Sequence, residues 1–247
     1  MPTSLPDGLV SDIDARVAAR MEDGHWPGLA VGIEYQGQTT VRAYGRADLE
    51  HQAPVSAETV FPIGAIAKQF TAGLILKLQE LGMLSVEDKV VQHLPDFPSH
   101  GDAITIHHLL TYTSGVARYS QSDYWRRSRE DLSQTEVLAL FQDLPLRFEP
   151  GTQHENSKSG YYLLALIAAR VTGRPYVDAV NEHVLQPLGL DHTTFMSTSR
   201  ITPNRARGYV WDEGGHRNAP YISVWMPGDG AGGWVPRSRI SSSGSGR

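Results

Sequence analysis

One short stretch near the middle of the first half carries a lysine where chemistry could take place. In FPIGAIAKQF (61–70), Lys68 follows a small-residue turn and opens an apolar helical run. A lysine at the start of a buried helix can transfer protons to or from a reacting group. It can equally be structural, with its aliphatic stem lying along apolar surface. The residue three positions earlier is Ala65, which offers no reactive group.

A second stretch, HENSKSGYY, places Ser157 beside Lys158 just before another apolar run. A serine flanked by a lysine could serve as a nucleophile. Serine is also a preferred N-cap, because its hydroxyl accepts a hydrogen bond from the first turn of a helix. We therefore favour Ser157 or Ser159 as the cap of the helix that starts near Gly160.

Histidines, glycines and aromatic residues raise three further possibilities. The chain has 10 histidines, but the adjacent pair in IHHLL would point to different faces of a helix, and the spacing H-E-x-x-H does not occur. We predict no metal or organic cofactor. The run GDGAGG (228–233) lacks the Lys-Ser/Thr pair of a phosphate loop and predicts an irregular turn. Aromatic residues could line a site or pack the helical region: Tyr119, Tyr124 and Trp125.

The hydrophobic pattern predicts the elements that would position these residues. Helical spacing is found over 9–21, and a strand pair around a Gln-Gly turn is predicted over 28–45. Further helices are predicted from Ala65 to a C-cap near Gly82, up to Gly115, over 135–142, up to Gly173 and from Pro175 to 190. From Asp191 onward the pattern predicts irregular structure. Early strands followed by a mainly helical middle indicate an α+β domain.

Composition excludes several classes of function. The net charge of -5 over 247 residues gives no basic surface for nucleic acid. No apolar run approaches the ~20 residues that span a bilayer. The N-terminus has no signal-peptide pattern and there are no cysteines, so we expect a cytoplasmic protein without disulfides.

Several motifs occur together in a characteristic order. They are VFPIGAIAKQFTAGLILKLQELGML, ITIHHLLTYTSG, FEPGTQHENSKSGYYLLALIAARVTG and VLQPLGLDHT, after the predicted strand pair. This order resembles the serine β-lactamase-related family, which includes class C β-lactamases, D-alanyl-D-alanine carboxypeptidases, D-aminopeptidases and esterases. The resemblance covers 10–233. It implies a β-lactamase/transpeptidase-like fold, with an antiparallel sheet flanked by helices plus an all-helical region, and a site in the cleft between them.

The resemblance also implies a set of site positions that this chain departs from. The family pattern has a nucleophilic serine three residues before a lysine, and Ala65 occupies the serine position before Lys68. Asn156 stands where the pattern has a tyrosine that exchanges protons. Lys158 stands where it has an asparagine that orients the lysine and the substrate amide. Without a hydroxyl at position 65 no acyl-enzyme can form there, and a second ammonium near Lys68 would make it harder for one of the two lysines to hold its proton.

The resemblance further implies a third motif and more sheet strands after Gly233. This chain continues only with WVPRSRISSSGSGR, so the C-terminal strands and helix are expected to be missing. We expect an incomplete β-lactamase-like domain over 1–233 and a disordered tail over 234–247.

The resemblance therefore implies acyl transfer or hydrolysis of a small amide, lactam, ester or D-amino-acid peptide, with greatly reduced or no activity. The alternative is a non-catalytic protein that uses the same cleft to bind a ligand or partner. Direct chemistry by Lys68 or Lys158, for example through a Schiff base, is a third possibility without specific support. The predicted partner is a small molecule, with no nucleic acid and no membrane; the oligomeric state is left open.

Overall fold

The computed structural model describes residues 7–119, 127, 129–196, 200–219, 230 and 234–236. The chain forms two compact units. The first consists of Met1–Phe61, Thr202–Pro220 and Pro236–Arg247, and the second of Pro62–Ile201 and Tyr221–Val235. The predicted tail after Pro236 lies outside the described residues, and the predicted domain boundary at 233 stays a prediction.

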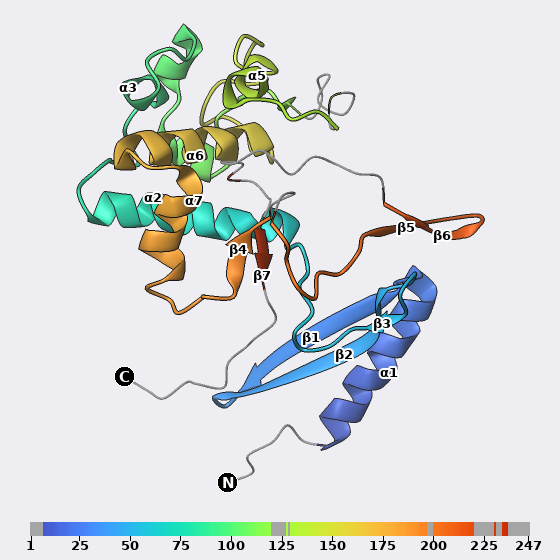
Figure 1. Ribbon diagram of the computed structural model, residues 1–247. Coiled ribbons are helices and arrows are strands. Elements are labelled where there is room, and N and C mark those ends of the chain that lie inside the picture. The colour runs from blue at the N-terminus through green and yellow to red at the C-terminus, as the bar shows by residue number, and fades with distance from the viewer. Residues whose placement is uncertain are drawn as a thin grey trace. The chain divides into compact units, whose positions relative to one another are not determined.

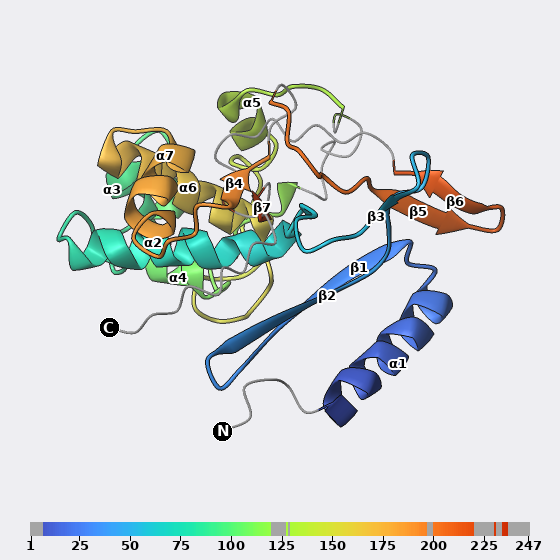
Figure 2. The ribbon, with the colours of Figure 1, turned by 60° about the horizontal axis from the view of Figure 1, so that its bottom comes forward.

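The N-terminal part of the first unit is a β-hairpin with one helix along it (Figures 1 and 2). Helix α1 (Asp7–Gly24) is followed by strands β1 (Gly28–Tyr35) and β2 (Gln38–Asp48), which pair antiparallel from Gly28↔Gly45 to Tyr35↔Gln38. The turn residues Gln36 and Gly37 both have positive φ, as a two-residue hairpin turn requires, which confirms the predicted Gln-Gly turn. Short strand β3 (Ala53–Pro54) adds to β2.

Hydrogen bonds and an ion pair join α1 to β2. Asp14 accepts hydrogen bonds from Tyr44 (2.5 Å) and from Arg42 (2.6 Å), which also forms an ion pair with it. These two contacts lower the pKa of the Asp14 carboxyl. The apolar spacing that predicts a helix over 9–21 is thus complemented by one acidic position that fixes the helix against the strand.

The region expected to be irregular contains strands, so that prediction is wrong. Strands β5 (Tyr209–Asp212) and β6 (Gly215–Asn218) form an antiparallel hairpin in the first unit. In the second unit, β4 (Thr193–Phe195) pairs with β7 (Trp234–Pro236). These strands have three or four residues each, which is too short for alternation to stand out in the sequence.

The second unit is mainly helical. Its elements are η1 (Gly64–Ala67), α2 (Lys68–Glu80), α3 (Val90–His93), η2 (Ser99–Ala103), α4 (Ile106–Leu110), α5 (Gln134–Ala139), α6 (Lys158–Thr172), α7 (Tyr176–Val180) and the π-helical turn η5 (Asn181–Leu185). Helices α2 and α6 lie side by side (Figures 1 and 2). Both helices contribute fully buried residues to the hydrophobic core: Leu74, Ile75, Leu78, Leu163, Leu164 and Ile167.

Most of the predicted helix ends in this unit are confirmed. Gly173 follows α6 directly and Gly82 follows Leu81, the C-cap of α2; both have left-handed φ, which a glycine adopts most easily at the end of a helix. Pro175 is the N-cap residue of α7. Three predictions need correction: the helix expected from Ala65 starts with a 3₁₀ turn, the one expected up to Gly115 ends at Leu110, and the one expected to run to 190 passes into η5. The α+β class is confirmed, and no helix in the described part of the chain is long and apolar enough to cross a membrane.

Candidate functional site

Lys68 is the first residue of α2 and points into the second unit. Its side chain is almost completely buried, with 7% of the residue exposed, and its Nζ lies 5.7 Å from the centroid of the Tyr161 ring. An ammonium at this distance from an aromatic ring is attracted by the electron-rich face of that ring. Tyr161 lies in the first turn of α6, so the lysine joins the starts of the two central helices. Ala65 lies in η1 one turn earlier and is exposed.

The start of α6 holds the other predicted site residues. Ser157 is the N-cap, and its Oγ accepts a hydrogen bond from the Gly160 amide at 3.4 Å. This hydrogen bond confirms the capping interpretation, and Ser157 is 4% exposed. Lys158 is the first helical residue and is half-buried, while Asn156 is exposed just before the cap. Lys68 thus contacts Tyr161 in the first turn of α6, the helix that Ser157 caps and Lys158 begins.

A backbone ladder positions the segment that enters α6. The amides of Arg147, Gly151 and Glu155 donate to the carbonyls of Gly115, Thr113 and Tyr112, at 2.8, 2.8 and 2.9 Å respectively. Gly115 has a φ of +72°, and a Cβ there would lie 2.1 Å from the Phe148 carbonyl oxygen. Only glycine fits this crossing.

The carboxylate of Glu155 is enclosed by two arginines. Its Oε1 lies 2.8 Å from Arg118 Nε and 2.7 Å from Arg147 Nε, and its Oε2 accepts from Arg147 Nε at 3.0 Å. This ion-pair group fixes the residue that precedes Asn156. Glu155 therefore holds the loop in place, and its negative charge is already matched by two guanidinium groups.

Two tyrosines that the sequence analysis did not single out complete the site. Tyr112 and Tyr161 have ring centroids 5.3 Å apart, and the Tyr161 hydroxyl donates to the Leu110 carbonyl at 3.2 Å. Burial raises the pKa of Tyr161 to about 12 and raises that of Tyr112 above its usual value. Tyr112 also has a φ of +60°, an uncommon conformation for a bulky residue. The sequence signal that could have pointed to Tyr112 is its place in TYTSG, three residues before Gly115.

The three aromatic residues that the sequence analysis named as possible site residues have different outcomes. Tyr119 is completely buried and packs at 6.2 Å from the Phe141 ring, and its amide donates to Ser159 Oγ at 2.9 Å, so it packs the helical region. Tyr124 and Trp125 lie outside the described residues.

Of the glycine run 228–233, the structure describes Gly230, which lies against both central helices. Its carbonyl accepts from Thr71 Oγ1 at 2.5 Å, and Thr71 Oγ1 lies 2.7 Å from the Tyr176 hydroxyl. A Cβ at Gly230 would lie 2.5 Å from the Tyr161 carbonyl oxygen. The run therefore needs a glycine here for close packing against α2 and α6.

Comparison with known proteins decides the family. Residues 13–239 match the family model described as Beta-lactamase. The chain belongs to the β-lactamase family. The resemblance inferred from the motif order is confirmed, and so is the β-lactamase/transpeptidase-like fold.

Individual relatives of this β-lactamase-family chain agree with the assignment. It is 31% identical over 210 residues to "Protein flp" of Staphylococcus aureus (strain MW2), covering 83% of this chain and 42% of that protein. It is 34% identical over 177 residues to "Penicillin-binding protein 4*" of Bacillus subtilis (strain 168), covering 69% and 39%. The solved structure of the octameric penicillin-binding protein homologue from Pyrococcus abyssi superimposes with a TM-score of 0.81 at 26% identity, covering 93% and 54%. The chain spans about two fifths of the length of these two curated relatives.

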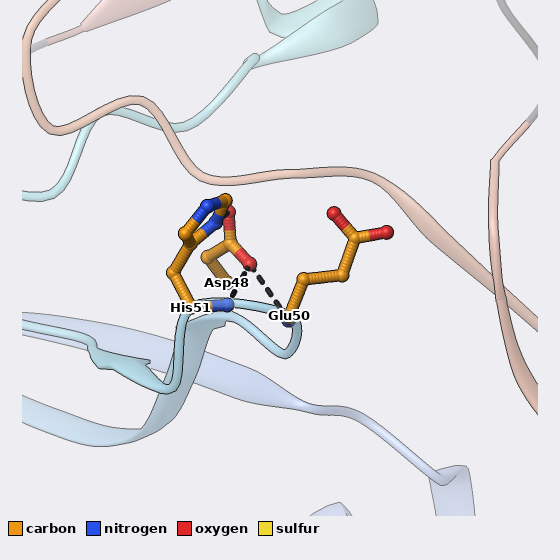
Figure 3. Close-up of side chains that lie close together, drawn as sticks. All are labelled: Asp48, Glu50 and His51. Carbon is orange, nitrogen blue, oxygen red and sulfur yellow. Dashed lines mark hydrogen bonds and ion pairs between the residues drawn. The ribbon is translucent and has the colours of Figure 1, made fainter.

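One cluster of possible metal ligands lies in the first unit of the β-lactamase-family chain, on the turn between β2 and β3 (Figure 3). Asp48, Glu50 and His51 each bring one ligand atom within 4.8 Å of the others. Asp48 Oδ1 accepts from the amides of Glu50 (2.8 Å) and His51 (2.9 Å), and Oδ2 lies 3.0 Å from His51 Nδ1. Glu50 accepts from Asn218 at 2.7 Å and pairs with Arg207. These contacts explain the cluster as a turn that anchors the β5–β6 hairpin.

Proposed function

We propose that this chain is a serine-hydrolase-type domain of the β-lactamase family in which acyl transfer is greatly reduced or lost. The observation that carries the proposal is the pairing of Ala65 with Lys68 at the start of α2. The lysine is retained and buried, but the position one turn before it has a methyl group instead of a hydroxyl. Removing a nucleophile leaves roughly 10³ to 10⁴-fold catalysis over water, from binding and electrostatics alone.

The neighbouring groups support the same proposal, because none is suited to replace the lost ones. Ser157 is buried, and its hydroxyl caps α6. Asn156 has an amide, which does not accept a proton near neutral pH. Burial raises the pKa values of Tyr112 and Tyr161, so both phenols stay protonated near neutral pH and neither is available as a general base.

The substrate or ligand class follows from the family. We propose a small amide, lactam, ester or D-amino-acid peptide, in line with relatives named as a penicillin-binding protein and a β-lactamase. The second candidate is non-catalytic binding of the same class of ligand. The ordered surroundings of the site favour this second candidate. Lys68 is buried and the Glu155 ion pairs hold the start of α6, although position 65 carries no hydroxyl group.

Covalent labelling tests the proposal directly. A fluorescent penicillin should leave no covalent label on the unaltered chain. Hydrolysis of a chromogenic ester and a chromogenic lactam should exceed the rate in buffer by no more than the roughly 10³ to 10⁴-fold that binding and electrostatics supply. The triple variant Ala65→Ser, Asn156→Tyr, Lys158→Asn should gain label. The matched control places the new serine at Ala72 on the same helix, with the same two other changes, and should gain none.

Stoichiometric labelling of the unaltered chain would contradict the loss of acyl transfer. Binding of an unlabelled penicillin, followed by tryptophan fluorescence, separates the two candidates: binding without label supports the non-catalytic one.

A further inference from the structure

Gly230 reaches the first turns of both central helices. Its carbonyl oxygen accepts a hydrogen bond from Thr71 Oγ1 at 2.5 Å, and Thr71 is the fourth residue of α2. A Cβ on Gly230 would lie 2.5 Å from the carbonyl oxygen of Tyr161, the fourth residue of α6. Gly230 itself is buried. Three segments that are far apart in the sequence therefore meet at this glycine.

The same two helical turns form the candidate site. Lys68 lies three residues before Thr71 on α2, and residues three apart share one face of a helix. The Lys68 ammonium lies 5.7 Å from the centroid of the Tyr161 ring. The ring of Tyr161 thus contacts the lysine while its backbone lies against Gly230. Gly230 is therefore an immediate neighbour of the site.

The hydrogen bond to Gly230 ends a chain of hydroxyl groups that has one direction. A threonine hydroxyl has a single hydrogen, and Thr71 donates it to the Gly230 carbonyl. The Tyr176 hydroxyl, 2.7 Å from Thr71 Oγ1, must therefore donate to Thr71. Thr71 is fully buried, and Tyr176, the first residue of α7, is 3% exposed. Tyr176 thus orients the Thr71 hydroxyl, and Thr71 in turn holds the Gly230 carbonyl.

Gly230 is held by packing on one side and by this hydrogen bond on the other. The Tyr161 carbonyl leaves no room for a side chain, so Gly230 cannot come closer to α6. The Thr71 hydroxyl keeps it from moving away, because a buried carbonyl that loses its donor is strongly disfavoured. The position of Gly230 beside the site therefore depends on the two hydroxyl groups.

We propose that Thr71 and Tyr176 are positioning residues for ligand binding at the starts of α2 and α6. They hold Gly230 where its backbone forms one side of the site, and they act on the ligand only through Gly230. The inference rests on the proposed function, since it concerns the same site and the same class of small amide, lactam, ester or D-amino-acid peptide. Affinity for that ligand then depends on hydroxyl groups that lie outside the motif positions.

The test measures the dissociation constant of benzylpenicillin by tryptophan fluorescence in three variants. Thr71→Val keeps the shape of the side chain but removes its hydroxyl, and should raise the constant at least about fivefold, the effect of one lost buried hydrogen bond. Tyr176→Phe leaves the Thr71 hydroxyl without its donor and should raise it roughly two- to threefold. Thr71→Ser keeps the hydroxyl and should stay within about twofold of the unaltered chain.

Tyr162→Phe is the matched control. Tyr162 is 1% exposed, and its hydroxyl donates to the Gln134 carbonyl at 3.1 Å. The control therefore loses a tyrosine hydroxyl from the same unit and should be destabilised in urea unfolding, but should keep the dissociation constant. Hydrogen exchange followed by mass spectrometry should be faster in the peptide that contains Gly230 in Thr71→Val and Tyr176→Phe, and unchanged there in Tyr162→Phe. If Thr71→Val does not fold, Tyr176→Phe decides the question.

The outcomes separate this inference from the proposed function. Unchanged affinity in Thr71→Val and Tyr176→Phe would overturn the inference and leave ligand binding standing. Weaker binding without faster exchange near Gly230, or an equal loss of affinity in Tyr162→Phe, would also overturn it. An unaltered chain that does not bind benzylpenicillin would contradict the binding function and the inference together.

Discussion

The two helix starts that form the site are built in different ways. Helix α6 begins with a serine cap, a backbone ladder and a carboxylate between two arginines. Helix α2 begins through a 3₁₀ turn, and among the described residues no side chain caps it. The start of α6 is therefore held by side-chain and backbone contacts, whereas α2 follows directly from the 3₁₀ turn η1. The contacts that hold the α6 start thus do not involve Ala65, Lys68 or Lys158.

The largest expected effect tests the backbone crossing that leads into α6. Gly115→Ala forces a Cβ within 2.1 Å of the Phe148 carbonyl oxygen, at a φ of +72°. We expect a loss of about 3 kcal/mol or more in the free energy of unfolding, or no folding, because both the clash and the strained φ must be relieved. Urea unfolding measures it.

Gly82→Ala is the matched control for this prediction. It has a similar φ of +70° and nothing within 4 Å of the added Cβ, so about 1 kcal/mol is expected. Equal losses of unfolding free energy in the two variants would show that the close approach of Gly115 to Phe148 does not hold the loop that leads into α6.

The next effect sharpens the contrast between a capped and an uncapped start. Ser157→Ala removes the buried hydroxyl that accepts from the Gly160 amide, and should lower the free energy of unfolding by about 1 kcal/mol. Ala65→Ser at the exposed start of α2 should change it by less than about 0.5 kcal/mol. Chemical denaturation of both variants checks the difference, and a large effect of Ala65→Ser would contradict the contrast.

The sequence predicts the local features of this arrangement and misses the long-range ones. The Ser157 cap, the helix ends at Gly82 and Gly173 and the Gln36-Gly37 turn depend on a few neighbouring residues, so their signals are visible in the sequence. The contact of Lys68 with Tyr161 joins residues far apart in the chain. The same holds for the two arginines around Glu155 and for the carbonyl of Gly230 on Thr71, which only tertiary packing brings together.

A smaller effect tests the charge at the α6 start. Lys158→Asn removes a cation from the positive end of the helix dipole and should raise the free energy of unfolding by about 0.3–1 kcal/mol in the absence of ligand. Thermal unfolding at low ionic strength measures the gain, which added salt should reduce. Lys77→Asn, far from any helix start, should give no gain. A loss of stability in Lys158→Asn would show that the lysine contributes more through packing than it costs in charge.

The smallest effect concerns the loop that leads into α6 and its support on α4. His108 Nδ1 accepts from the Thr105 amide at 3.2 Å, so the ring must be unprotonated at this atom. Burial, followed by the charge of His107, lowers the pKa of His108 below its ordinary value of 6.5. The unfolded chain therefore binds the proton more readily, and the stability that His108 contributes is present above pH 6.5 and declines as the pH falls through the lowered pKa.

His108→Gln should flatten this decline by a few tenths of a kcal/mol between pH 7 and pH 5, measured by urea unfolding at each pH. Nε2 of the same ring lies 3.5 Å from where a Cβ on Gly151 would be, so His108 lies beside the loop that leads into α6. An unchanged pH dependence in His108→Gln would place the acid sensitivity elsewhere and leave the α6 start supported by its ion pairs and cap alone.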